Sequence, residues 1–263
     1  PHRGGGGGHT SYVRTILQSD LRVEFALAVA APEGSGVWEA GVTLGVPTFV
    51  CDFPGNIKEV LHVVRAVRRF EQICREWSPD LVHVNGARDQ GIVVFWKHFY
   101  RRGVPCVRAH LAVRCIPDNS FNRWSYQRMV QGHVYVGHSA KNISWADGFL
   151  RPRNARVIPV GVDVDFWKPG PKDPSSLEKN GLAPTDFVFG SHAGMGRHKR
   201  TDLFLRGAAL ALRRGTRPFK VLLRGKDDEV HVSQELAAEL GLKDIIYVRH
   251  EPDPRGYLSL IDV

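Results

Sequence analysis

Glycines and basic residues that stand before helix-like segments are the first candidates for chemistry in this sequence. The glycines of Gly4–Gly8 directly precede the helix-like segment HTSYVRTIL. A second segment, Arg197–Arg200, follows a strand-like run and precedes a helix that we expect to begin near Thr201. Free N–H groups at the positive end of a helix favour a phosphate or an oxyanion, and arginine and lysine suit a diphosphate. The alternatives are an unstructured glycine-rich terminus and a merely basic turn.

A histidine is the next candidate. His110 closes the strand-like run VPCVRAH, and doubly wound sheets bind ligands at the carboxyl ends of their strands. An imidazole there can hydrogen-bond a ligand hydroxyl or stabilise developing charge. A structural histidine is the alternative, and it is the interpretation we favour for His83, which lies inside the short run LVHV.

No metal site is predicted. Asp163 and Asp165 form a D-x-D pair, a pattern that can hold a divalent cation, but they lie in a predicted linker and do not follow a buried strand. The acidic run 227–229 reads as the polar start of a helix. The four cysteines form no C-x-x-C pair, which indicates buried free thiols in a reducing compartment; they are Cys51, Cys74, Cys106 and Cys115.

The elements that must position these residues alternate between strand and helix. Helix-like stretches, such as 57–76 and 201–213, separate the strand-like runs, and this order predicts parallel, doubly wound sheets. The predicted strands are 22–29, 46–50, 81–84, 104–109, 133–136, 157–160, 187–191, 219–224, 245–248 and a last one beginning at 260.

A proline-rich stretch divides the chain. Residues 161–176 hold three prolines and two glycines, which is typical of a linker. We therefore expect an α/β protein with two Rossmann-like domains, at 1–158 and 177–263, joined by a linker at 159–176. The second sheet looks unfinished at Val263, and the chain begins with Pro1, so we expect a piece of a longer gene product.

Composition narrows the function classes. The chain has 263 residues, of which 43% are hydrophobic and 24% charged, as in ordinary globular proteins. This composition excludes a chain that is disordered throughout its length. No apolar stretch is long enough to cross a bilayer. The net charge is +9, and residues 1–158 carry most of the excess, with 20 Lys and Arg against 12 Asp and Glu. Such a domain suits an acidic substrate or an anionic membrane face; no motif supports nucleic acid.

Several segments resemble one family in the same order along nearly the whole chain. RVIPVGVDVDFWKP, 156–169, resembles the interdomain signature of family 4 retaining glycosyltransferases, which have the GT-B fold. PDLVHVNG, 79–86, resembles the P-D-x-V-H-x-H segment of that family, and GVPCVRAH, 103–110, resembles its G-x-P-x-V-x-x-x-H segment. HKRTDLFLRGAAL resembles the basic loop and helix of the second domain.

The chain also departs from the family. Asn85 replaces the second histidine of H-x-H. Arg197 matches the expected arginine of the basic loop only across a gap, since Gly194 takes that place without one, whereas Lys199 matches directly. The paired glutamates of the family, E-x7-E, would lie beyond Val263. We therefore expect this stretch of chain to be inactive by itself.

The resemblance implies a reaction and a set of roles. A retaining glycosyltransferase moves a sugar from a nucleotide-diphosphate sugar to an acceptor hydroxyl, here a saccharide or lipid-linked acceptor in polysaccharide, lipopolysaccharide or glycolipid synthesis. Gly7, Gly8, Arg197 and Lys199 would bind the donor, and His110 would lie beside the transferred sugar. The resemblance implies no metal and no cofactor. We expect a cytoplasmic protein, and the basic first domain would suit peripheral binding at the inner membrane face.

Other functions stay open. The altered basic loop and Asn85 also fit a GT-B protein that binds a sugar or nucleotide without catalysis. A GT-B sugar-nucleotide epimerase is a further alternative, although the linker signature argues against it. A nucleic-acid-binding module would explain the charge but neither the linker nor the glycines.

Overall fold

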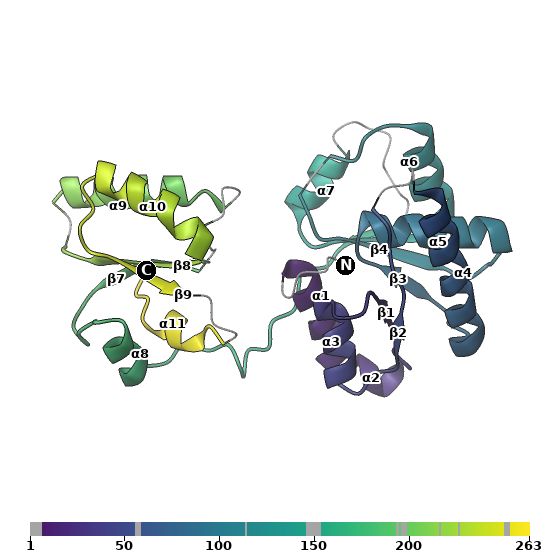
Figure 1. Cartoon of the computed structure of the whole chain (residues 1–263), viewed down its shortest axis with the longest axis horizontal. Coiled ribbons are helices and arrows are strands. Elements are labelled where there is room, and N and C mark those ends of the chain that lie inside the picture. The colour runs from purple at the N-terminus through teal and green to yellow at the C-terminus, as the bar shows by residue number, and fades with distance from the viewer. Residues whose placement is uncertain are drawn as a thin grey trace. The chain divides into compact units, whose positions relative to one another are not determined.

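The computed structural model describes residues 7–55, 59–113, 115–145, 154–192, 195, 199–215, 217–225, 227–249 and 253–263. The chain forms two compact units, Pro1–Val162 and Asp163–Val263 (Figure 1). Every paired strand of the described residues runs parallel to its neighbour. The expectation of an α/β protein with parallel Rossmann-like sheets is therefore confirmed.

The first unit holds two sheets. A two-stranded sheet pairs β1 (Val29–Ala31) with β2 (Thr48–Val50), and a four-stranded sheet has the order β3-β4-β5-β6. The strands of the larger sheet are β3 (Val82–Val84), β4 (Cys106–His110), β5 (Gly132–Tyr135) and β6 (Ala155–Val157). The helices are α1 (Gly8–Gln18), α2 (Leu21–Glu24), α3 (Gly36–Thr43), α4 (Val60–Trp77), α5 (Ala87–Tyr100), α6 (Ser120–Trp124), the π-helix η1 (Ser125–Met129) and α7 (His138–Trp145).

Two long helices supply much of the core of this unit. The buried face of α4 repeats at intervals of three and four residues, as an amphipathic helix requires, and carries Val67, Phe70 and Ile73. On α5, Trp96 is fully buried and meets Phe70 edge to face, with ring centroids 5.1 Å apart. These contacts hold α5, and therefore the loop before it, firmly against the sheet.

The second unit is a three-stranded sheet covered on both faces. Its order is β7-β8-β9, with β7 (Val188–Ser191), β8 (Lys220–Gly225) and β9 (Ile245–Arg249). Figure 1 shows α9 (Thr201–Arg213) and α10 (Asp227–Glu239) on one side of the sheet, and α8 (Pro174–Lys179) and α11 (Arg255–Ser259) on the other. Alternate residues of β8 serve the two sides: Val221 and Leu223 pack with α9, and Leu222 packs with Tyr257.

Three local expectations need correction. Residues 22–29 do not form a strand: Leu21–Glu24 is a short helix and the strand is Val29–Ala31. Val23 is 87% exposed, so this apolar run has no sheet to pack against, and a short apolar run alone does not distinguish helix from strand. Residues 260–263 form no assigned strand, although the Gly190 N–H donates to the Val263 carbonyl beside β7. Cys115 is exposed, whereas the other free cysteines are buried or half-buried.

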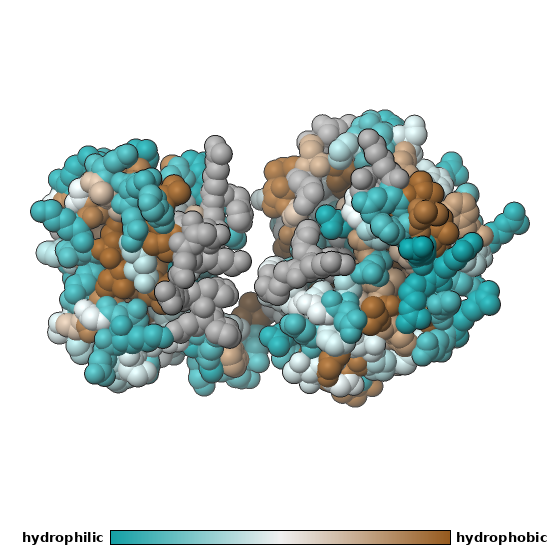
Figure 2. Space-filling view, in the orientation of Figure 1, coloured by the Kyte–Doolittle hydropathy of each residue, from teal (hydrophilic) through white to brown (hydrophobic). Residues whose placement is uncertain are grey.

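The segment between β6 and α8 is open to solvent. Residues 158–171 are exposed and include Phe166 and Trp167. The Asp163 carboxylate accepts hydrogen bonds from the N–H groups of Asp165 and Phe166, so it closes a turn. Hydrophobic and hydrophilic patches alternate over both units (Figure 2). Within the described residues, no helix is both long and apolar enough to span a bilayer.

Candidate functional site

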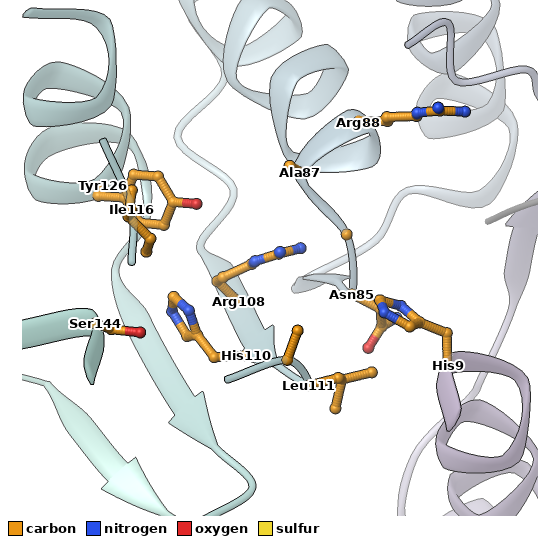
Figure 3. Close-up of a pocket in the computed structure, with 12 residues that line it drawn as sticks. His9, Asn85, Ala87, Arg88, Arg108, His110, Leu111, Ile116, Tyr126 and Ser144 are labelled. Atoms are coloured by element: carbon orange, nitrogen blue, oxygen red, sulfur yellow. The ribbon is translucent and has the colours of Figure 1, made fainter. Parts of the chain in front are cut away.

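A pocket of about 240 Å³ lies in the first unit, at the carboxyl end of β4 (Figure 3). It is assembled from segments far apart in the sequence: α1, the turn before α5, the end of β4, η1 and α7. Its lining residues are His9, Asn85, Gly86, Ala87, Arg88, Arg108, His110, Leu111, Ala112, Ile116, Tyr126 and Ser144. The position agrees with the rule that parallel sheets bind ligands beyond the carboxyl ends of their strands.

His110 is buried in the wall of this pocket and held on two sides. Its Nε2 lies 3.0 Å from Nδ1 of His133 on the neighbouring strand β5. Its ring stacks on Tyr135, with centroids 4.2 Å apart and planes 10° apart. The parallel register pairs Arg108 with His133 and His110 with Tyr135, which is why these four side chains meet on one face of the sheet.

The hydrogen bonds fix the tautomers of both histidines. Nε2 of His133 lies 3.1 Å from the Tyr126 carbonyl oxygen, which only accepts, so this nitrogen carries the proton. In neutral His133, Nδ1 is then the acceptor for the N–H of His110 Nε2. It follows that Nδ1 of His110 is an acceptor, and no described residue donates to it. A ligand hydroxyl is a suitable partner.

Both histidines are neutral at physiological pH. Burial, together with the charges of Arg108 and His133, lowers the pKa of His110 to about 2. Burial is also the main reason that the pKa of His133 falls to about 4; the Tyr126 carbonyl opposes this shift and Arg108 adds to it. His110 can therefore orient a ligand through a hydrogen bond but is not a proton donor near pH 7.

The glycines at the start of α1 directly precede His9, one of the residues that line this pocket. Gly7 is the N-cap residue, with a φ of 154° that residues with a Cβ rarely adopt, and Gly8 is the first residue of the helix. His9, the next residue, lines the pocket together with His110. The structure thus brings the start of α1 and the end of β4 to one place.

The basic loop belongs to the second unit. Lys199 is exposed and stands two residues before α9 begins at Thr201. Arg200, between them, adopts a left-handed conformation with a φ of 57°. Arg197 lies outside the described residues. The donor-binding roles of Arg197 and Lys199 therefore stay predictions.

Several pocket residues were not predicted from the sequence. Arg108, Tyr126 and Ser144 line the pocket. Asp89 pairs with Arg108, and His133 lies within hydrogen-bond distance of His110. The period of two along a strand offered one signal: Arg108 stands two residues before His110 and so faces the same way. The partners on α5 and β5 follow from the fold alone.

With this geometry established, family membership is clear. The sequence profile of Glycosyltransferase Family 4 matches residues 6–166, more than half of the chain. The chain belongs to this family. The match spans the whole pocket, from His9 to Ser144.

Solved structures agree on the fold. A glycosyltransferase from Rickettsia africae superposes with a TM-score of 0.78 at 17% identity, covering 97% of this chain and 67% of its own. Anabaena HepE, solved with UDP and glucose, gives a TM-score of 0.71 at 17% identity, with 98% and 69% covered. WaaG, described as a glycosyltransferase involved in lipopolysaccharide biosynthesis, gives 0.55 at 12% identity, with 99% and 71% covered. These similarities establish a GT-B fold. No curated protein sequence matches the chain.

Proposed function

We propose that this protein is a retaining glycosyltransferase that transfers a sugar from a nucleotide-diphosphate sugar to an acceptor hydroxyl. The observation that carries the proposal is the pocket of the first unit, where a neutral, tautomerically fixed His110 meets the start of α1. An uncharged acceptor nitrogen in a polar pocket suits a sugar hydroxyl. Membership in Glycosyltransferase Family 4 supports the same conclusion.

The donor is a nucleotide sugar in this proposal. Anabaena HepE shares the fold and was solved with UDP and glucose, which supports a uridine-diphosphate sugar as the first donor to test. Gly7 and Gly8 leave the start of α1 without side chains, so backbone N–H groups there are open to a phosphate.

The reaction needs positive charge beside the leaving diphosphate, which becomes more negative as the bond breaks, and it involves no redox step. The bond between the anomeric carbon and the diphosphate oxygen breaks, a bond to the acceptor oxygen forms on the same face, and the acceptor proton passes to the departing diphosphate. Arg197 and Lys199 are proposed to stabilise the charge that develops there. We propose that they do so without a metal ion.

His110 positions the transferred sugar. Its Nδ1 accepts a hydrogen bond from a sugar hydroxyl, while Nε2 remains bonded to His133. Because the imidazole is neutral, this bond orients the sugar without changing its protonation. The expected result for His110→Asn is a 10- to 100-fold lower kcat/KM, and the pH profile from pH 6 to 8 should keep its shape.

We propose that the first unit binds the acceptor, a lipid-linked or envelope saccharide, at an anionic membrane surface. WaaG, with the same fold, is named for lipopolysaccharide biosynthesis. The first turns of α4 present Leu61, 73% exposed, and Val64 beside the exposed Arg65 and Arg68. Apolar and basic side chains on one helix face favour the headgroup region of anionic bilayers.

A sedimentation experiment tests the membrane step. The protein should bind vesicles of phosphatidylcholine with 30% phosphatidylglycerol, and Leu61→Gln combined with Arg65→Gln should weaken the binding. Arg156→Gln, an exposed charge on β6, is the matched control. Equal binding to pure phosphatidylcholine, or none at all, would contradict the step.

A donor panel tests the proposed reaction. The chain, and the longest product of the same gene, are incubated with UDP-glucose, UDP-galactose, UDP-N-acetylglucosamine and GDP-mannose, each with a lipid extract as acceptor and with EDTA. Acceptor-dependent release of nucleoside diphosphate is expected for one donor. Binding without turnover would favour the non-catalytic alternative, and an altered sugar nucleotide formed without acceptor would favour the epimerase.

A further inference from the structure

A buried guanidinium forms part of the pocket wall. Arg108 is only 8% exposed, although it lies on a sheet strand between Val107 and Ala109. It shares a face of β4 with His110, because alternate strand residues point the same way. Figure 3 shows its guanidinium projecting from β4 into the space between Tyr126 on one side and Asn85 on the other.

The hydrogen-bonding capacity of this guanidinium is largely unused. Nη1 lies 3.9 Å from Oδ1 of Asp89, an ion pair too long for a hydrogen bond. The other oxygen of Asp89 accepts from the N–H groups of Asn85 and Gly86. Within the described part of the chain, neither Nε nor Nη1 of Arg108 has a hydrogen-bond partner. Burying such donors unpaired is costly, which points to a ligand that completes them.

The surrounding groups favour a negative charge. Gly86, Ala87 and Arg88, which line the pocket, form the start of α5, a helix of 14 residues whose N-terminal N–H groups and dipole attract anions. Arg88 also lines the pocket, although its guanidinium lies over Gly55 and points away from Arg108 (Figure 3). His110 and His133 are uncharged, so Asp89 is the one acidic side chain within ion-pair distance of Arg108 among the described residues.

The neutral donors and acceptors of the pocket suit a sugar. The Oδ1 atom of Asn85 is buried without a partner in the described residues, and the side chains of Tyr126 and Ser144 also line the pocket. With the transferred sugar at His110, an acceptor sugar beside it would therefore meet a hydroxyl-binding group at Asn85, and its other end would meet the guanidinium of Arg108.

We propose that Arg108 binds a carboxylate or phosphate on an acceptor sugar that lies in this pocket beside the transferred sugar, so that the acceptor is an acidic saccharide. The inference rests on the proposed glycosyl transfer and specifies its acceptor class. Arginine is the residue best suited to the task, because its planar fork donates two parallel hydrogen bonds to an oxyanion. Arg108 is thereby a specificity-determining residue and takes no part in bond breaking.

Binding to the intact 263-residue chain, without any donor, tests the proposal. Isothermal titration is performed with glucuronic acid, glucose 6-phosphate and glucose. The two acidic sugars should bind at least 10-fold more tightly than glucose, and whichever binds better identifies the anionic group. Arg108→Gln should remove this preference, Arg108→Lys should keep part of it, and Arg22→Gln, at an exposed charge on α2, should leave it unchanged.

A second variant keeps the proposal testable if Arg108→Gln does not fold. Asp89→Asn keeps an acceptor for the Asn85 and Gly86 N–H groups but removes the carboxylate that competes for Arg108. This variant should bind the acidic sugars about threefold more tightly and should bind glucose with unchanged affinity. Near-ultraviolet circular dichroism confirms the fold of each variant.

Three results would overturn the proposal. In the first, glucose binds as tightly as the acidic sugars. In the second, Arg108→Gln is folded but weakens the binding of all three sugars equally. In the third, UDP alone binds, and its affinity depends on Arg108 as strongly as that of the acidic sugars. The last result would assign Arg108 to the donor diphosphate. Because none of these titrations requires turnover, failure of the acid preference is distinguishable from failure of the transferase activity.

Discussion

At the scale of single residues, the paired histidines make the stability of the protein depend on pH in a defined direction. Their folded pKa values, about 2 for His110 and about 4 for His133, lie below the unfolded value near 6.5. The unfolded chain therefore binds more protons once the pH falls below about 6.5. Stability is complete above that pH and is lost as the pH falls toward 4, by up to about 1.4 kcal/mol per pH unit for each histidine.

Urea unfolding between pH 4 and pH 8 checks this prediction. His133→Gln keeps a donor for the Tyr126 carbonyl and an acceptor for His110, but it cannot titrate. Its free energy of unfolding should fall less steeply below pH 6.5 than that of the native protein. His231→Gln, at an exposed histidine on α10, should not change the slope. Identical slopes for the native protein and His133→Gln would show that His133 is not held neutral.

A second residue-scale prediction concerns the leaving group. Lys199→Ala should lower kcat/KM for transfer by on the order of 100-fold, because the variant lacks one of the two cations that we propose to stabilise the departing diphosphate. Steady-state kinetics with the longest product of the gene measures this effect. Lys243→Ala removes another exposed charge, between α10 and β9, and should have no effect. A Lys199→Ala enzyme with native kinetics would remove Lys199 from the site.

The sequence made some of these residues predictable and left others hidden. His110 was predictable because it ends an apolar run, and such ends gather at one edge of a parallel sheet. The place of Arg108 in the pocket wall was not predictable, because it depends on Asp89 and on the register that sets Arg108 beside His133. Register is a property of neighbouring strands, and one strand does not reveal it.

At the scale of elements, a buried carboxylate ties α4 to α5. Glu71 is 3% exposed and accepts hydrogen bonds from Trp96 at 2.6 Å, Arg75 at 2.7 Å and Arg102 at 2.5 Å. Burial would raise its pKa, but these bonds outweigh burial and lower the pKa to about 2. Glu71→Gln should therefore destabilise the first unit by about 2 kcal/mol, since it replaces the charge-assisted bonds from Trp96 and the two exposed arginines with neutral ones.

Chemical denaturation at pH 7 measures this loss. Glu76→Gln, which removes an exposed carboxylate from the same helix, should change the free energy of unfolding by less than about 0.5 kcal/mol. If Glu71→Gln were equally mild, the carboxylate would not be the link between the two helices.

Element boundaries followed the sequence where packing and local signals agree. Residues 201–213 form α9 as predicted, because buried Leu205, Ala208 and Ala209 repeat at helical spacing. The prediction of a strand at residues 22–29 was wrong. Their apolar content suggested a strand, but the segment begins with a short helix, and Val23 and Phe25 remain exposed. Hydrophobicity without a clear period does not say which surface will cover it.

At the scale of the whole molecule, the chain consists of two units with separate cores, joined by an exposed segment. Brief digestion with chymotrypsin should first cleave after Phe166 or Trp167, which are exposed in that segment. Two fragments that resist further digestion are expected, because each unit buries its own hydrophobic clusters. Mass spectrometry identifies the cut. Cleavage within α5 or β8 before the segment would contradict separate folded units.

The most direct measurement of the central claim follows the anomeric protons of donor and product by nuclear magnetic resonance during turnover. The longest product of the gene is incubated with its preferred nucleotide sugar, its acceptor and EDTA. Acceptor-dependent transfer with the same anomeric configuration in donor and product is the predicted result. Inverted product, or no transfer with any nucleotide sugar, would contradict the proposal that this protein is a retaining, metal-independent glycosyltransferase.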